Sequence, residues 1–274
     1  MPKLIEDGRH RTSASSQDGE GASPRPTEPS RARCRARAKT LLTILAALVL
    51  APLTVVVGMG IPGNGYYLSG TLIVLYAIVP FFVAFEGRRP TAREIAVVAV
   101  LTALAVAARA AFVWVPHFKP MAAIIMIAGI AAGPQTGFLV GSVAALASNF
   151  IFGQGPWTPW QMLAFGLVGL VAGLLADARV FPRANLSWPR RVALAVTGFV
   201  LIVGLAGPIL DTSTFFYLST ASTPELAATV YLAGLPVNAI HGAATALTLL
   251  VVANPLLDQL ARVRVKYGLL NRSR

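Results

Sequence analysis

The chain has 274 residues, 55% of them hydrophobic, a mean hydropathy of +0.67 and a formal net charge of +12. Long apolar runs at this composition exclude a water-soluble globular domain and indicate an all-α polytopic membrane protein. In a soluble protein this charge would suggest nucleic acid, but membrane topology accounts for it here, so the expected partner is the lipid bilayer and not nucleic acid. Cys34 is the only cysteine, which excludes an intramolecular disulfide and a Cys-based metal site.

Eight apolar runs are candidate membrane spans. If the N-terminus is cytoplasmic, all but two of the 23 Lys and Arg residues lie in segments on the cytoplasmic side. Because translocating Lys and Arg is costly, this sorting predicts a multi-pass protein of the cell (plasma) membrane with both termini in the cytoplasm. The two exceptions are Arg109 and Lys119. The eight runs are 40–57, 66–85, 93–113, 119–133, 135–153, 159–177, 192–210 and 226–253.

The chain divides into four segments of different composition. Residues 1–39 are rich in Ser, Pro, Arg and Glu and predict a disordered basic cytoplasmic tail. Residues 40–87 predict two accessory transmembrane helices, apolar nearly all round. Residues 92–255 hold nearly every unusual polar side chain and predict a six-helix core, in which the short segment 119–133 is expected to be buried or oblique. Residues 256–274 predict a basic cytoplasmic tail.

Small residues recur at helical spacing in the predicted core. In lipid, helices associate by close packing, which small side chains permit. The glycines of the fourth to sixth spans therefore predict packing inside the bundle. A stripe of alanines in the third span either packs in the same way or docks another subunit. The glycines are Gly129, Gly133, Gly137, Gly141, Gly166, Gly169 and Gly173, and the alanines are Ala99, Ala103, Ala107 and Ala111.

Polar and aromatic residues gather on the predicted outer side. Arg109 and Lys119, placed against the charge bias, predict a site that attracts an anion or contacts a substrate; the alternative is a snorkelling side chain. The loop 153–160, "GQGPWTPW", brings aromatic rings beside neutral hydrogen-bonding groups. Such groups suit a planar or heteroatom-rich organic ligand, although the tryptophans alone would fit an interfacial belt. These residues are Asn149, Gln154, Trp157, Thr158, Trp160 and Gln161.

The last span carries Asn238 and His241, which are three residues apart and share a helix face. They either contact a ligand or make hydrogen bonds within the protein. Asp211 and Glu225 flank a predicted outer loop, 211–225, that could cover an outward-facing cavity. No carboxylate is expected inside a span, which argues against a proton-coupled carrier.

Several motifs of catalysis are missing from the sequence. It contains no Gly-x-x-x-x-Gly-Lys-Ser/Thr run, no His-Glu-x-x-His and no Gly-x-Ser-x-Gly. A binding protein is therefore expected rather than an enzyme, without a cofactor or a metal. A membrane enzyme that uses His241 is disfavoured because partner acids are missing.

The core resembles a known family of membrane proteins. The stretch from Arg109 to Asp177, with its "PHFKP" turn, its "AGIAAGPQTGFLVGSVAALASNF" helix pair and its "GPWTPWQM" loop, is similar to the S components of energy-coupling factor (ECF) transporters. These are six-helix subunits that capture a vitamin or related micronutrient outside the cell. The resemblance covers residues 92–255 and leaves the tail and the first two helices as additions.

The resemblance implies partners and a substrate class. The alanine stripe would dock a transmembrane coupling protein, and two ATPase subunits would supply the energy. The 153–160 loop resembles members tied to cobalamin-type compounds or their precursors, and His117 or His241 could then contact cobalt. The competing hypothesis is a membrane scaffold of similar fold, such as a cell-envelope organising protein, with the stripe and the basic tail as its interaction surfaces.

Overall fold

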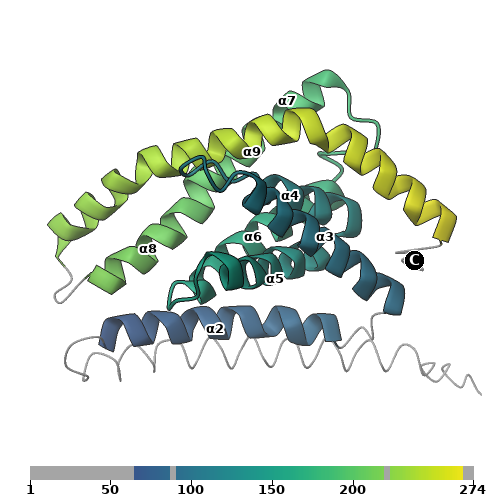
Figure 1. Cartoon of the computed structure of the whole chain (residues 1–274). Coiled ribbons are helices and arrows are strands. Elements are labelled where there is room, and N and C mark those ends of the chain that lie inside the picture. The colour runs from purple at the N-terminus through teal and green to yellow at the C-terminus, as the bar shows by residue number, and fades with distance from the viewer. Residues whose placement is uncertain (1–64, 87–90, 219–222, 268–274) are drawn as a thin grey trace, which may run out of the picture.

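The computed structural model describes residues 65–86, 91–218 and 223–267, and every secondary-structure element in this part of the chain is helical (Figure 1). The predicted tail 1–39 and the predicted first span 40–57 lie outside the described residues. The elements are α2 (Gly65–Glu86), α3 (Ala92–Ala111), α4 (Met121–Ala132), α5 (Pro134–Phe152), α6 (Thr158–Asp177), α7 (Trp188–Leu201), the π-helical turn η1 (Ile202–Ala206), α8 (Gly207–Leu218) and α9 (Pro224–Tyr267).

Within the described residues, five helical runs are long and apolar enough to cross a membrane. The predicted all-α polytopic class is therefore confirmed, whereas the arrangement of six core helices plus two stays a prediction. Figure 1 shows α9 along one side of the molecule and α2 along the opposite side, with α3 to α6 between them. The five runs are Ala92–Ala111, Pro134–Phe152, Thr158–Asp177, Trp188–Leu218 and Pro224–Lys266.

Local sequence sets where the core helices begin. The Thr91 hydroxyl accepts a hydrogen bond from the Glu94 backbone N–H at 3.3 Å, and the Glu94 carboxylate accepts one from the Thr91 backbone N–H at 2.9 Å. This capping box starts α3. Only Gly133 separates α4 from α5, and its φ of 99° lies in a region that glycine adopts without strain. Pro134 then opens α5 at a position where its missing N–H costs nothing.

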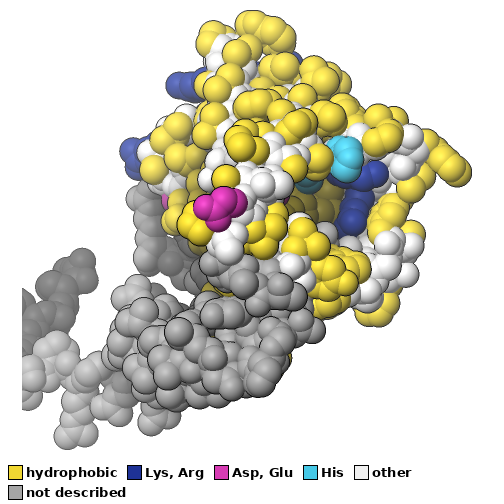
Figure 2. All heavy atoms as spheres, turned by 90° about the vertical axis from the view of Figure 1, so that its left-hand side faces the viewer, with side chains coloured by type: hydrophobic (Ala, Val, Ile, Leu, Met, Phe, Trp, Pro, Cys, Tyr) yellow, Lys and Arg dark blue, Asp and Glu magenta, His cyan; other side chains and the backbone are white. Residues whose placement is uncertain are grey.

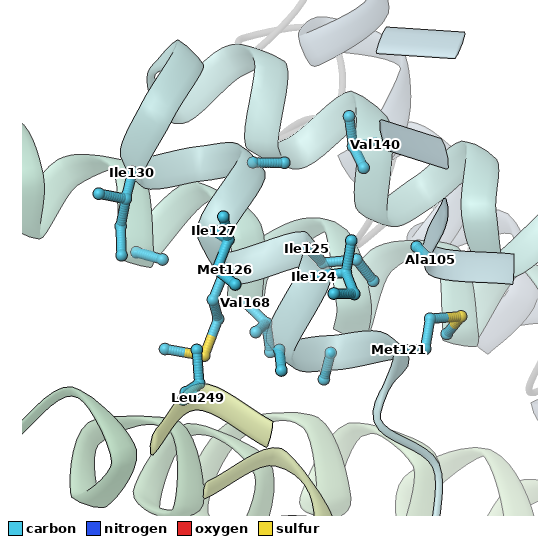
Figure 3. Packing of buried hydrophobic residues seen from close by; sticks show 14 of the residues in the cluster. Ala105, Met121, Ile124, Ile125, Met126, Ile127, Ile130, Val140, Val168 and Leu249 are labelled. Atoms are coloured by element: carbon cyan, nitrogen blue, oxygen red, sulfur yellow. The ribbon is translucent and has the colours of Figure 1, made fainter. Parts of the chain in front are cut away.

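The centre of the molecule is α4, whose residues from Met121 to Ile130 are all buried. Its 12 residues span about 18 Å, less than the roughly 30 Å hydrocarbon core of a bilayer. The prediction of a buried fourth segment is confirmed. Figure 3 shows its side chains packed among those of neighbouring helices, with Met126 directed towards Leu249 of α9.

The glycines predicted to pack inside the bundle bring α4, α5 and α6 into backbone contact. A side chain at Gly129 or at Gly137 would clash with the backbone of Gly169, and one at Gly141 would clash with the backbone of Phe165. Such close approach strengthens dispersion contacts, which replace the hydrophobic effect between helices in lipid. The predicted role of these glycines in helix packing is confirmed.

The two ends of the bundle differ, and we name them by their residues. The site end carries residues 112–120 and 153–157, and the basic end carries residues 178–191 together with the last turns of α9. At the basic end, side chains of α9 hold the linker between α6 and α7. The Asp258 carboxylate accepts a hydrogen bond from the Asn185 N–H at 2.7 Å, and the Asn254 side-chain oxygen accepts one from the Leu186 N–H at 2.8 Å.

The prediction of an outer loop at 211–225 is wrong for residues 211–218. These residues belong to α8, so that Trp188–Leu218 is one helical run with a π-helical turn inside it. The polar residues do not end the helix, because their side chains find partners within the bundle. The Thr212 hydroxyl donates to the Pro208 carbonyl at 2.6 Å and the Thr214 hydroxyl donates to the Leu210 carbonyl at 3.2 Å. A lid made of residues 211–218 is therefore excluded.

Candidate functional site

A chain of hydrogen bonds between side chains lies at the site end, and the buried amide of Asn149 is its centre. The Asn149 side-chain nitrogen donates to the Thr158 hydroxyl at 3.0 Å and to the Gln161 side-chain oxygen at 2.8 Å. The Thr158 hydroxyl donates to the Gln154 side-chain oxygen at 2.9 Å. Four predicted binding residues from two helices and one loop are therefore brought together. Their bonds fix the orientation of each amide group.

The network holds the guanidinium of Arg109 at the end of α3. Arg109 Nη1 donates to Ser148 Oγ at 2.5 Å and to Asn149 Oδ1 at 3.0 Å. Its Cζ atom lies 4.7 Å from the centroid of the Phe152 ring, within the range of a cation–π contact. The alternative of a snorkelling Arg109 does not fit this geometry, because three groups of the protein hold the guanidinium.

Lys119 lies next to Arg109, in the loop that joins α3 to α4. Lys119 Nζ lies 6.0 Å from the centroid of the same Phe152 ring and donates to the Phe112 carbonyl at 3.3 Å. Partial burial lowers the pKa of Lys119, and the positive charge of Arg109 lowers it further. Two cations therefore share one aromatic ring at the site end.

The loop 112–120 folds as a series of tight turns. Phe112 and Phe118 pack with ring centroids 5.1 Å apart, and Trp114 is 90% exposed. His117 is exposed and has a φ of 59°, a left-handed conformation that is uncommon outside glycine. The two histidines predicted to contact a ligand thus differ, because His117 faces outwards whereas His241 is enclosed.

His241 lies in α9, with its ring centroid 5.7 Å from that of Phe165. Its Nε2 atom is buried and has no hydrogen-bond partner. A buried polar nitrogen without a partner is costly, so a group that this ring can bond is a natural complement.

Asn238, one turn before His241, faces a different neighbour. Its side-chain nitrogen donates to the Asp211 carboxylate of α8 at 2.9 Å. In the same pair of helices, the hydroxyls of Thr212 and Tyr231 lie 2.6 Å apart. Asp211 lies in the helical run Trp188–Leu218, whose 31 residues are more than a bilayer requires, so the absence of a carboxylate inside a span stays a prediction. In the sequence, an acid within an apolar stretch indicates a loop. The partner that allows Asp211 to lie in a helix is Asn238, which is 27 residues away and cannot be recognised from the local pattern.

The two tryptophans of the 153–160 loop do not come together. Trp160 is 6% exposed, and its ring packs against Phe216 of α8 with the centroids 6.0 Å apart. It belongs to a hydrophobic cluster that includes Val74 and Ile78 of α2. Trp157 is 42% exposed and its ring lies over Gly155. Trp160 is thus a packing residue in this structure, and Trp157 lies at the surface.

Figure 2 looks onto the site end and shows a hollow among hydrophobic side chains, with Lys or Arg and His side chains exposed on its wall. The described residues of the site end include Arg109, Lys119 and the exposed His117. Sequence reasoning missed Ser148, Phe152 and Phe165. The only sequence signal for Ser148 is that it directly precedes Asn149 in an otherwise apolar helix.

The alanine stripe lies on an exposed face of α3. All four members are exposed, whereas Leu101, Thr102 and Ala105 form the buried face of the same helix. The stripe therefore does not pack inside the described part of the chain, and the docking of another subunit on it stays a prediction. Its members are Ala99, Ala103, Ala107 and Ala111.

Several helices that could span a membrane, with cations and hydrogen-bonding side chains gathered at one end, define this chain as a polytopic membrane protein. The chain belongs to the S components of ECF-type transporters: the family model of the "ECF-type riboflavin transporter, S component" matches residues 90–262. The family is one of transporter subunits and not of enzymes.

One curated relative is a UPF0397 protein of Vibrio atlanticus (strain LGP32), 31% identical over 104 residues. The match takes 37% of this chain and 53% of the relative, so the chain spans about half the length of that relative. No solved structure matches the chain.

Proposed function

We propose that this protein is the substrate-capturing subunit of an ECF-type importer and that it binds a heteroaromatic vitamin or its precursor in the hollow at the site end. The observation that supports this most is the Asn149 network. Its amide is fully used, accepting from Arg109 and donating to Thr158 and Gln161. The Gln161 oxygen is thereby occupied, while its NH₂ group has no partner among the described residues and remains free to donate to a ligand.

The surroundings of the network suit a flat ligand. Phe152 places an aromatic ring beside the polar groups, and sites for small molecules combine such apolar surface with a few fixed polar groups. The family model is named for riboflavin, which is one candidate. A cobalamin-type compound or a precursor is the other, because of the 153–160 loop.

The orientation in the membrane follows from the charges. The described Arg residues other than Arg109 lie in segments 91–93, 179–191 and 262–264, which the positive-inside rule assigns to the cytoplasm. The site end then faces outwards and both termini are cytoplasmic. A coupling protein would dock on the alanine stripe of α3, and two ATPase subunits would drive release of the substrate.

Co-purification tests the binding function directly. The full chain is purified in mild detergent, denatured, and the released small molecules are identified by mass spectrometry. We expect one compound in near-stoichiometric amount, with riboflavin and cobalamin-type compounds distinguished by mass and by absorbance.

Gln161→Met is the matched variant, since it removes the free NH₂ group but keeps the length of the side chain. It should lower the affinity for the released compound about tenfold, the effect of losing one well-placed hydrogen bond. Gln259→Met, the same change on an exposed position of α9, is the control and should bind as the wild type does. An empty preparation that is also not stabilised by any vitamin would contradict the proposed function and favour the scaffold.

A further inference from the structure

Arg109 and Lys119 are two cations for which the described part of the chain supplies no counter-ion. Both lie near the Phe152 ring, at 4.7 Å and 6.0 Å from its centroid. Neither forms an ion pair within the described residues; Arg183 does so with Asp177, at the basic end. Like charges that are close and partly shielded from water repel one another, and an anion between them relieves that repulsion.

The donors of both cations are only partly used. Arg109 makes its two hydrogen bonds through Nη1 alone, which leaves Nε and Nη2 without partners among the described residues. Lys119 has three N–H donors and uses one, towards the Phe112 carbonyl. Ser148 and Asn149 accept hydrogen bonds from one side of the Arg109 guanidinium. They therefore fix the direction of its other edge, which carries Nε and Nη2. Such an edge matches the two oxygens of a carboxylate or a phosphate.

The acids at this end do not compensate the cations. The carboxylate of Asp211 accepts a hydrogen bond from Asn238, between α8 and α9, and does not contact Arg109 or Lys119. Glu225 is exposed, in the first turn of α9. His241 adds a buried Nε2 atom that has no partner among the described residues. The wall that carries Arg109 and Lys119 is therefore electropositive, with unused donors from the end of α3 and from the loop before α4.

We propose that the ligand of this protein carries an anionic group, a carboxylate or a phosphate, which is held by Arg109 and Lys119 at the Phe152 side of the hollow. The proposal rests on the proposed function and narrows it to acidic vitamins or phosphorylated precursors. The neutral amides of Asn149 and Gln161 then serve the uncharged part of the same ligand.

Two flavins that differ by one phosphate test the proposal. Binding of riboflavin and of riboflavin 5′-phosphate to the purified full chain in detergent is measured by quenching of flavin fluorescence. We expect the phosphate ester to bind about tenfold more tightly, because each charge-assisted hydrogen bond is roughly twice as strong as a neutral one. Lys119→Gln should reduce this preference to about threefold or less, because it removes one of the two cations that hold the phosphate. Lys266→Gln, the same change at the basic end, should keep it.

Every other outcome of these binding measurements either supports or overturns the proposal of an anionic ligand. Equal affinity for both flavins, or a preference that survives Lys119→Gln, overturns the proposal and leaves the proposed function intact. If neither flavin binds, the binding measurement is repeated with the compound that co-purifies with the protein. An acidic compound that binds more weakly to Lys119→Gln supports the proposal, and a neutral compound overturns it. If no compound is found, the proposed function fails and the proposal fails with it.

The anion could also come from a lipid headgroup. The melting temperature is therefore measured in nanodiscs of phosphatidylcholine with and without phosphatidylglycerol. Stabilisation by phosphatidylglycerol that is lost in Lys119→Gln, without any preference between soluble ligands, assigns the site to lipid and overturns the proposal.

Discussion

Two helix pairs in this protein both contain glycines at their contact, but for different reasons. Between α5 and α6, Gly137 and Gly169 bring two backbones together, and a side chain at either position would clash with the main chain of the other. Between α8 and α9, Gly207 lies against the Asn238 amide and Gly234 lies against the Asp211 carboxylate. The first pair uses glycine to remove side chains, and the second uses it to make room for polar ones.

The difference separates a fixed wall of the site from an adaptable one. Backbones in direct contact have no side-chain torsions that could absorb a shift, so α5 and α6 hold Asn149 and Gln161 rigidly. The contact between α8 and α9 depends on the Asp211–Asn238 hydrogen bond and on the paired hydroxyls of Thr212 and Tyr231. Polar side chains can exchange partners with water or a ligand, so this wall can rearrange without loss of the fold.

The largest effect is expected from Gly169→Leu. Its side chain would meet the backbone of Gly137 and the Ile125 side chain, and overpacking of this kind costs about 3 kcal/mol or more when the backbone cannot yield. Little folded protein should be recovered, as measured by size-exclusion profile and melting temperature. Gly204→Leu is the matched control, because nothing lies within 4 Å of a Cβ there. Equal recovery of both variants would contradict the fixed wall.

Asp211→Leu should have a smaller effect. It leaves the buried amide of Asn238 without its acceptor, which costs roughly 1–3 kcal/mol. The double variant with Asn238→Leu should recover part of the loss, giving a coupling of at least about 0.5 kcal/mol between the two positions. Melting temperatures of the four proteins complete the cycle. Strict additivity would mean that the hydrogen bond contributes nothing to the contact.

Gly234→Ala should cost less again, at most about 1 kcal/mol, since its Cβ meets the end of a side chain that can turn away. Gly137→Ala, the same change in the other pair, meets backbone atoms and should cost clearly more. Melting temperatures measured in parallel distinguish them. Similar costs at both positions would remove the distinction between the two walls.

The smallest effect on stability is expected from Ala103→Leu with Ala107→Leu, because both residues are exposed on α3. Neither ligand affinity nor melting temperature should change, whereas uptake by cells that contain the coupling module should fall about tenfold or more. Ala96→Leu, also exposed on α3 but outside the stripe, should transport normally. Normal uptake by the double variant would exclude docking on the stripe.

Sequence patterns were sufficient for features that depend on one segment. The glycine spacing predicted the tight packing around α4. Arg109 and Lys119 stood out because they are the two basic residues that do not follow the positive-inside rule. The amides around the 153–160 loop indicated where polar groups gather, but not that Asn149 and Thr158, nine residues apart, bond to one another.

Features that depend on distant partners could not be predicted in this way. Asp211 indicated a loop, since its partner Asn238 lies in the next helix. Trp160 fitted an interfacial or ligand-binding aromatic residue, and its burial depends on Phe216 of α8 and on Val74 of α2. The arrangement of neighbouring helices decides which of them a lone polar or aromatic residue faces. Local patterns in a single sequence do not reveal that arrangement.

The shortness of α4 has a consequence for how the protein is made. A helix of 12 apolar residues inserts easily into lipid but is too short to cross it, so it has no stable transmembrane position by itself. Its partners α5, α6 and α9 are all synthesised later, and the last of them, which carries Leu249, ends the described chain. The hydrophobic centre therefore closes only after α9 has been synthesised. Truncation of α9 would leave a membrane-inserted chain without a finished core.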